Sequence, residues 1–295
     1  MRSLLFTPAD SERKIAKALA SSADGVILDL EDSVVSERKA VAREICAATL
    51  ADSRRMPLFV RIQPLETEGA LMDLAAVVRA KPAGIVLPKC SGASDLSLLD
   101  RFLCALEVRD GIPVGDTAVI AIVTESGRSL GSLPSYRRSP PPRVQSFTWG
   151  GEDLAADLGA LTNRDQHSRY PPVYEFARTF CLLAAAAAGV TAIDAVYTDF
   201  LDLEGLRSEA ESAARDGFLG KLAIHPAQLD VINEVFTPTQ RQTQQAERVV
   251  AAFDEDPDAG AIALDGKMLD RPHLRSAMRL LARVATLKAD KGNSK

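Results

Sequence analysis

Charged side chains that could support metal-assisted chemistry recur directly after short apolar runs of the sequence. If those runs are parallel strands of one sheet, their carboxyl ends share a face and bring these side chains together. Converging carboxylates repel one another unless a cation lies between them, and oxygen ligands completed by water and substrate suit Mg²⁺. Any one carboxylate alone is more often structural, as an arginine partner or a helix cap, so the prediction rests on the set. The charged members of the set are Asp29, Glu31, Asp32, Arg61, Lys89, Glu125, Glu152, Asp153, Asp199 and Asp202. Gly150 and Gly151, which directly precede Glu152 and Asp153, are included with them.

Two other kinds of chemistry are not favoured by these residues. Zinc prefers histidine or cysteine, and His225 is the only histidine near the end of an apolar run. An imine-forming lysine needs a lowered pKa, whereas an acidic surrounding raises it. We therefore expect Lys89 to pair with carboxylates.

The segment WGGED, residues 149–153, is the most informative local motif. Glycines at 150 and 151 let the backbone approach a ligand closely, and the N–H groups that open the next helix can bind a carboxylate. Two glycines can equally serve only to make a tight turn between strand and helix. The sequence leaves both interpretations open.

Eight β-rich runs alternate with segments of helical period, and most of the runs are apolar throughout. Such strands are typical of a parallel sheet covered by helices, and eight units predict an α/β fold, a (β/α)₈ TIM barrel. A barrel takes about 250 residues, which fits a chain of 295. An open doubly wound sheet is the alternative, disfavoured because no glycine-rich phosphate motif follows the first run. The runs are 3–8, 25–31, 58–62, 84–89, 118–125, 144–150, 192–198 and 221–226.

The chain is expected to divide into a barrel domain, residues 1–253, and a helical C-terminal extension, residues 254–295. The extension contains an amphipathic stretch suited to a helix. A proline-rich segment at 137–143 must be a loop, and residues 288–295 are expected to fray.

The composition argues against two classes of partner, nucleic acid and membranes. A net charge of −5 gives no broad positive field for nucleic acid or an anionic membrane surface, and no apolar stretch is long enough to span a bilayer. The N-terminus lacks the pattern of a signal peptide. Cys46, Cys90, Cys104 and Cys181 are widely spaced, which predicts reduced thiols and a cytoplasmic location.

The same motifs resemble a known family. RSLLFTPA, ILDLEDSV, VRI, VLPK, VTES, GGEDLAADLG, YTDFLDLEGL, IHPAQL and DGKMLDRPHL occur in order along nearly the whole chain. This order resembles the citrate lyase β-subunit-like branch of the HpcH/HpaI aldolase family, which includes malyl-CoA and citramalyl-CoA lyases.

The resemblance implies roles for individual residues. Matching motifs makes Glu125 and Asp153 the Mg²⁺ ligands, with Mn²⁺ as an alternative cation. Arg61 would lie beside the substrate oxygens, and Glu31 and Asp32 would hold waters of the metal or orient Arg61. Gly150, Gly151 and Glu152 would bind substrate. Asp270 of the extension would act over a neighbouring subunit's active site, which implies a homo-oligomer, a trimer or hexamer.

The implied activity is Mg²⁺-dependent cleavage of a 3-hydroxyacyl-CoA thioester of the malyl, citramalyl or citryl type into acetyl-CoA and a 2-keto acid. Two alternatives remain: an aldolase acting on free hydroxy-keto acids, and a citrate lyase subunit using an acyl-carrier-protein thioester. Two departures from the family pattern leave the acyl group undefined. Gln63 replaces the asparagine that usually follows VRI, and residues 162–178 differ from the usual Gly/Glu-rich segment.

Overall fold

A computed structural model describes residues 1–52, 56–137 and 140–293. The chain forms two compact units, Met1–Phe236 and a second that begins at Thr237, and each is described by itself. The expected boundary after residue 253 lies inside the helix α10, Gln240–Glu255. The structure divides the chain earlier because α10 packs within the second unit.

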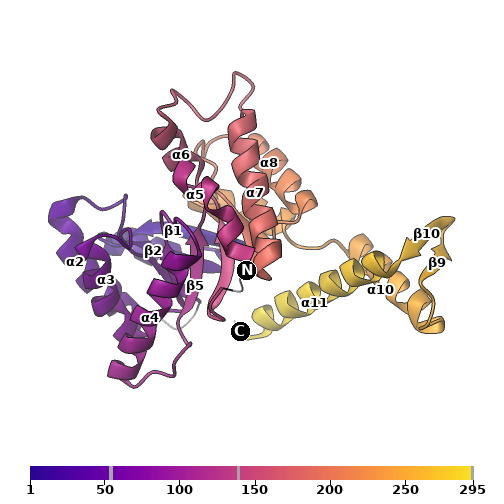
Figure 1. Ribbon diagram of the computed structural model, residues 1–295, viewed down its shortest axis with the longest axis horizontal. Helices are drawn as coiled ribbons and strands as arrows, with labels where there is room; N and C mark the ends of the chain where they lie inside the picture. Colours follow the sequence, from indigo (N-terminus) through magenta and orange to yellow (C-terminus); the bar gives the residue numbers. More distant parts are fainter. Residues whose placement is uncertain (53–55, 138–139, 294–295) are drawn as a thin grey trace. The chain divides into compact units, whose positions relative to one another are not determined.

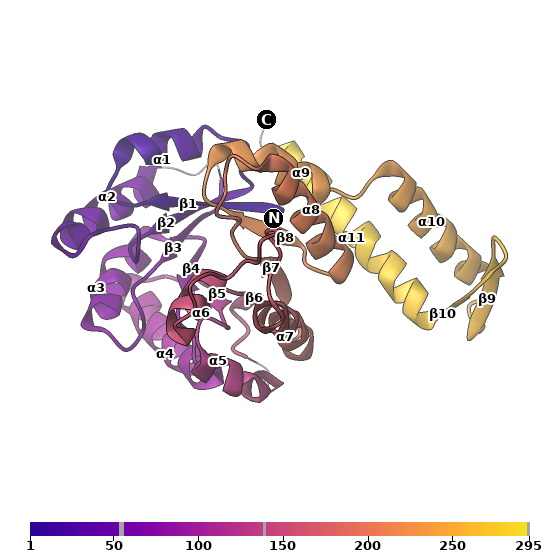
Figure 2. The same cartoon turned by 90° about the horizontal axis from the view of Figure 1, so that it is seen from above.

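The first unit is a closed barrel of eight parallel strands in sequence order. β1 pairs with β8 at Leu5 and Ala223, which closes the ring and confirms the predicted (β/α)₈ fold. Figures 1 and 2 show the helices outside the ring of strands. The strands are β1 Ser3–Pro8, β2 Gly25–Asp29, β3 Leu58–Arg61, β4 Gly84–Leu87, β5 Ala118–Ile122, β6 Val144–Thr148, β7 Thr191–Asp194 and β8 Gly220–Ala223.

Helices connect consecutive strands, and a short 3₁₀ turn accompanies several of them. The 3₁₀ turns are Ser36–Arg38, Val78–Ala80, Leu133–Arg137 and Pro226–Gln228. The helices are α1 Glu12–Leu19, α2 Lys39–Asp52, α3 Glu68–Val77, α4 Ala93–Asp110, α5 Gly127–Gly131, α6 Gly151–Leu158, α7 Pro172–Ala188, α8 Leu203–Asp216 and α9 Leu229–Val235.

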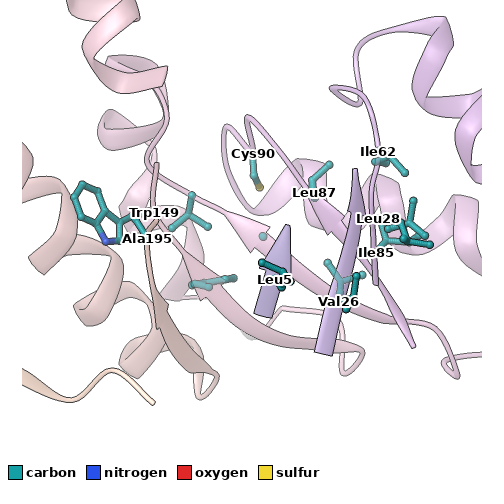
Figure 3. Packing of buried hydrophobic residues seen from close by; sticks show 14 of the residues in the cluster. Leu5, Val26, Leu28, Ile62, Ile85, Leu87, Cys90, Trp149 and Ala195 are labelled. Carbon is teal, nitrogen blue, oxygen red and sulfur yellow. The ribbon is translucent and has the colours of Figure 1, made fainter. Parts of the chain in front are cut away.

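Alternate residues of each strand enter two different cores, which explains why the strands are apolar throughout. Ile27 and Phe59 belong to a cluster made of strand residues inside the barrel. Val26 and Leu28 join the larger cluster between strands and helices. Figure 3 shows part of that larger cluster, with Leu5 beside Val26, its register partner on the next strand.

Each of the eight expected runs contains a strand, but seven of the strands end before the run does. The run expected at 118–125, for example, leaves the sheet after Ile122. The residues after each strand turn out of the sheet into loops at the carboxyl end of the barrel, and these loops carry the candidate site.

The second unit contains α10, a β-hairpin and α11, Arg271–Asn293. The hairpin joins β9, Ala261–Leu264, to β10, Lys267–Asp270, through Asp265 and Gly266 at φ 51° and 72°. Two positive φ values mark a type I′ turn, which Asp-Gly favours. The extension therefore contains the expected amphipathic helix, α11, and in addition a hairpin that was not predicted.

Two irregular segments fall partly outside the described residues. Residues 138–139 of the expected loop and 294–295 of the expected tail are not described. The segment expected to fray, from residue 288, is helical up to Asn293, where α11 ends. In the described part of the chain, no helix combines the length and apolarity needed to cross a bilayer.

Candidate active site

Arg61 is held by Asp29 inside the mouth of the barrel. The two residues are register partners at the ends of β3 and β2. Arg61 Nε and Nη2 donate to the two carboxylate oxygens of Asp29, each at 2.7 Å. Burial acts to raise the pKa of Asp29, but the hydrogen bonds and charge of Arg61 outweigh it and hold the pKa below its ordinary value. A bidentate contact of this kind fixes the plane of the guanidinium.

Glu31 and Lys89 extend this charged cluster. Glu31 Oε2 lies 2.9 Å from Arg61 Nη1, and Lys89 Nζ donates to Glu31 Oε1 at 2.6 Å. Asp32 is more exposed, at 3.9 Å from Arg61 and 3.8 Å from Lys89. Burial alone would lower the pKa of Lys89, but the bond to Glu31 and the neighbouring carboxylates raise it. Lys89 is therefore an ammonium paired with carboxylates, as its surroundings predicted.

Glu125 and Asp153 face the same pocket. Glu125 follows β5 and is buried, and its carboxylate accepts the backbone N–H of Lys89. Lys89 adopts a left-handed φ of 51°, a conformation that side-chain-bearing residues rarely take. Asp153, in the first turn of α6, lies 3.2 Å from Lys89 Nζ. Burial first, then the charge of Asp153, raises the pKa of Glu125 well above its ordinary value.

Gly150 and Gly151 are required by space rather than by backbone conformation. Gly150 has φ −132°, which any residue can adopt, but a Cβ there would lie 2.7 Å from Glu125 Cγ. A Cβ on Gly151 would lie 3.2 Å from the Trp149 ring. The first glycine therefore makes room for Glu125, a reason that neither sequence interpretation included. Glu152 is exposed and accepts from Asn163 Nδ2 at 2.7 Å, and its role in substrate binding stays a prediction.

Lys89 lines two neighbouring pockets, or hollows, at this end of the barrel. One, of about 350 Å³, is lined by residues that include Glu125, Asp153 and Arg128. The other, of about 520 Å³, includes Glu31 and Asp32. It also includes Gln63, whose side chain is tied to Asp73 of α3 at 3.2 Å.

The structure thus brings together seven of the charged residues in the predicted set: Asp29, Glu31, Asp32, Arg61, Lys89, Glu125 and Asp153.

Asp270 belongs to the second unit, at the end of β10. Its Oδ1 lies 2.6 Å from Nδ1 of His273, and this contact lowers the pKa of Asp270. Its carboxylate thus meets both the imidazole and the backbone N–H of His273 in the first turn of α11, and the second is the contact of a helix cap.

Other members of the initial set have structural partners. Asp202 accepts from Gly205 N at 2.9 Å at the start of α8 and from the Tyr197 hydroxyl at 2.7 Å. Asp199 accepts from Leu201 N at 3.1 Å in the same turn. These two carboxylates therefore hold the loop after β7.

The site residues fit a hard divalent cation. Within the described residues, no three His, Cys, Asp or Glu side chains are arranged to hold a metal. A cation at Glu125 and Asp153 would thus take two carboxylates and fill its other positions with water and substrate. Mg²⁺ is commonly bound in this way because it keeps several waters. Burial and then the charge of Asp153 raise the pKa of Glu125, and a cation between the two carboxylates would offset both effects.

Sequence reasoning missed two contacts of this site. Asp29 makes the paired contact that orients Arg61, in addition to Glu31, one of the two residues for which that role was expected. The signal was present, since Asp29 and Arg61 each end an apolar run, on successive strands. The backbone contact from Lys89 to Glu125 had no signal, because it depends on an uncommon backbone conformation.

Comparison with known proteins agrees with this geometry. The family described as HpcH/HpaI aldolase/citrate lyase matches residues 2–226. The chain is 36% identical over 292 residues to the (3S)-malyl-CoA thioesterase of Cereibacter sphaeroides, covering 98% of this chain and 96% of the relative. It is 33% identical over 308 residues to the mitochondrial citramalyl-CoA lyase of Rattus norvegicus, covering 97% and 87%.

A solved structure is also similar to this chain over nearly its whole length. The protein CitE of Mycobacterium tuberculosis, in complex with magnesium, acetoacetate and coenzyme A, aligns with a TM-score of 0.77 at 34% identity. The alignment covers 96% of this chain and 98% of that one. Together with the match across the whole barrel, these relatives show that the chain belongs to the HpcH/HpaI aldolase/citrate lyase family.

Proposed function

We propose that this protein is a Mg²⁺-dependent carbon–carbon lyase that cleaves a 3-hydroxyacyl-CoA thioester into acetyl-CoA and a 2-keto acid. The observation that carries the proposal is the pair of carboxylates, Glu125 and Asp153, which face one pocket with the charged Lys89, itself joined through Glu31 to the fixed Arg61. The names of the relatives support it: a malyl-CoA thioesterase, a citramalyl-CoA lyase and a protein that binds magnesium with coenzyme A.

The chemical demand of the reaction is negative charge on oxygen, first on the alkoxide and then on the thioester enolate. Bound Mg²⁺ supplies Lewis-acid stabilisation of that charge and lowers the pKa of a coordinated hydroxyl. Glu125 and Asp153 would hold the ion. Arg61 provides a permanent cation beside the developing charge, and Asp29 keeps its donors in one plane.

The turn at Gly150–Gly151 has a separate role in this proposal. The N-terminal N–H groups of α6 are free of intrahelical acceptors, so they can bind the carboxylate of the acyl group. Lys89 lies at the junction of the two hollows, where its ammonium balances the excess of carboxylates. Glu31 keeps that ammonium in place.

The protonation of the enolate needs an acid, and the family resemblance points to the C-terminal unit. In the proposal the partner subunit's Asp270 protonates the acetyl-CoA enolate, which requires a homo-oligomer such as a trimer or hexamer. The C-terminal unit then packs on a neighbouring subunit. A cytoplasmic location completes the proposal, and free thiols at Cys46, Cys90 and Cys181 support it.

Hydrolysis of the thioester is the second candidate, because a relative 36% identical to this chain is named a malyl-CoA thioesterase. The test is to supply malyl-CoA and citramalyl-CoA in turn, with Mg²⁺ and with EDTA, and to quantify acetyl-CoA and free CoA. Metal-dependent acetyl-CoA with an equal amount of keto acid supports the lyase. Free CoA with intact hydroxy acid identifies the thioesterase. No turnover of any thioester, despite Mg²⁺ binding, refutes the CoA-dependent activity and favours the acyl-carrier-protein or free keto-acid substrates.

A further inference from the structure

We propose that a closed circuit of six side chains behind the WGGED turn is a positioning apparatus for that turn. The inference rests on the proposed function in one respect, since it treats Asp153 as a metal ligand. The six residues come from the position after β6, from β7, β8 and α8, and from the segment between α6 and α7. They are Trp149, Asp194, Lys221, Glu209, Arg164 and Tyr170.

The first half of the circuit is buried in the layer between strands and helices. Trp149 Nε1 donates to Asp194 Oδ1 at 2.8 Å, and Lys221 Nζ donates to Asp194 Oδ2 at 2.7 Å. Both Asp194 and Lys221 are 0% exposed. Asp194 and Lys221 are register partners on β7 and β8, and each stands next to a residue that points into the barrel. Figure 3 shows Trp149 close to Ala195, the residue after Asp194.

The second half runs through the segment between α6 and α7 and returns to the tryptophan. Lys221 Nζ also donates to Glu209 Oε1 at 2.8 Å, and Glu209 Oε2 accepts from Arg164 Nη1 at 2.6 Å. Arg164 Nη2 donates to the Tyr170 hydroxyl at 2.6 Å, and its guanidinium lies 3.8 Å from the centre of the Tyr170 ring. The Tyr170 ring meets Trp149 edge-on at 4.9 Å, which closes the circuit.

The circuit touches the turn at two places. Gly151 lies against the Trp149 ring, since a Cβ at Gly151 would be 3.2 Å from it. Asn163, the neighbour of Arg164, donates to Glu152 at 2.7 Å. The indole therefore forms the surface on which Gly151 rests, and the segment held by Arg164 holds the helix turn that carries Asp153.

The two cations of the circuit, Lys221 and Arg164, meet its two anions, Asp194 and Glu209, and Arg178 adds a further ion pair with Asp194. A buried ionic network contributes little net stability compared with apolar packing, so its directional contacts are its advantage. Each hydrogen bond admits one orientation of its partner, which apolar packing does not impose. The circuit thus fixes the orientation of Trp149, and with it the position of the turn.

The test uses two variants and a control. Arg164→Met keeps the aliphatic stem but removes the contacts to Glu209 and Tyr170, and Trp149→Phe removes only the indole donor and part of the ring. Arg207→Met is the control, because it breaks a comparable ion pair of 2.6 Å with Glu234 that is exposed and lies outside the circuit. Mg²⁺ affinity is measured by calorimetry, and amide hydrogen exchange over residues 150–155 is measured without metal.

Both circuit variants are expected to accelerate exchange over residues 150–155 and to weaken Mg²⁺ binding about tenfold, within the range for residues behind metal ligands. The double variant is expected to lose no more than the stronger single variant, since the circuit acts as one unit. Arg164→Lys, which retains the charge, is expected to recover part of the affinity. Arg207→Met should change neither quantity.

Unchanged exchange in Arg164→Met and Trp149→Phe overturns the inference, whatever the metal affinity. Faster exchange with unchanged Mg²⁺ affinity also overturns it, because the turn would then not control the metal site. A native protein that binds no Mg²⁺ is a separate failure, that of the proposed function. The exchange measurement still decides whether the circuit holds the turn.

Discussion

Gly150→Ala tests whether the Glu125 side chain can occupy its position only because residue 150 has no side chain. The backbone at Gly150, φ −132° and ψ 104°, suits alanine, so the substitution introduces no strain of its own. The added Cβ would lie 2.7 Å from Glu125 Cγ and 3.1 Å from Oε1. Carbon atoms in contact lie about 3.5–4.0 Å apart, so the Glu125 side chain must retreat by about 0.8 Å. Mg²⁺ demands near-ideal geometry at about 2.0–2.1 Å, so a displacement of this size removes the ligand from its place.

The expected result is a Mg²⁺ dissociation constant raised about tenfold or more, about 1.4 kcal/mol, with the barrel still folded. Overpacking of this kind costs about 1–3 kcal/mol of folding stability in proteins, so the melting temperature should fall as well. Calorimetric titration of Mg²⁺ measures it, and thermal unfolding checks the fold. Gly131→Ala is the matched control, because a Cβ there meets nothing within 4 Å. Native Mg²⁺ affinity in Gly150→Ala, with an unchanged melting temperature, would refute the assignment of Glu125 as a ligand.

Three further predictions follow from single contacts. Arg61→Lys keeps a charge but loses the paired bonds to Asp29, so kcat on the preferred thioester should fall about 100-fold while Mg²⁺ binding persists; native kcat would contradict this. Asp270→Asn should abolish turnover and leave Mg²⁺ affinity intact, and unchanged turnover would refute the role. Burial acts to raise the pKa of Glu107, but hydrogen bonds from Arg143 and two backbone N–H groups outweigh it and lower the pKa to about 2. The contribution of Glu107 to the free energy of unfolding, on the order of 2 kcal/mol, is present above the unfolded pKa of about 4.3 and is lost as pH falls toward about 2. Acid unfolding should show this loss in the native protein and not in Glu107→Gln, and identical pH profiles would refute it.

The barrel could be predicted because each strand is buried on both faces. A run such as 118–125 is apolar at successive positions, since Ile120 enters one core and Ala121 the other. The ends of the strands could not be predicted from that pattern. Apolar residues such as Val123 remain buried after the strand has left the sheet.

The hairpin of the second unit was missed although its signal is in the sequence. Asp265-Gly266 between two short apolar stretches is a typical type I′ turn. Flanking strands of four residues each are too short for alternation to be recognised.

The site could be predicted as a set of residues but not as a set of contacts. Strand ends meet at one face of a barrel, so the positions of Arg61, Glu125 and Asp153 after apolar runs are enough to group them. Which carboxylate holds Arg61 depends on strand register, and the register selects Asp29. The circuit behind Trp149 joins Asp194 and Lys221, single charges in apolar strands. A charge inside such a run is a useful signal of a buried ion pair, but it does not identify the partner.

The central claim is that Glu125 and Asp153 together hold the catalytic metal. Its most direct test is a crystal of the native protein soaked with Mn²⁺ and measured for anomalous scattering. The account predicts one strong peak at metal–ligand distance from a carboxylate oxygen of both residues, and no such peak in Glu125→Gln. A peak elsewhere, or one that persists unchanged in Glu125→Gln, would contradict it.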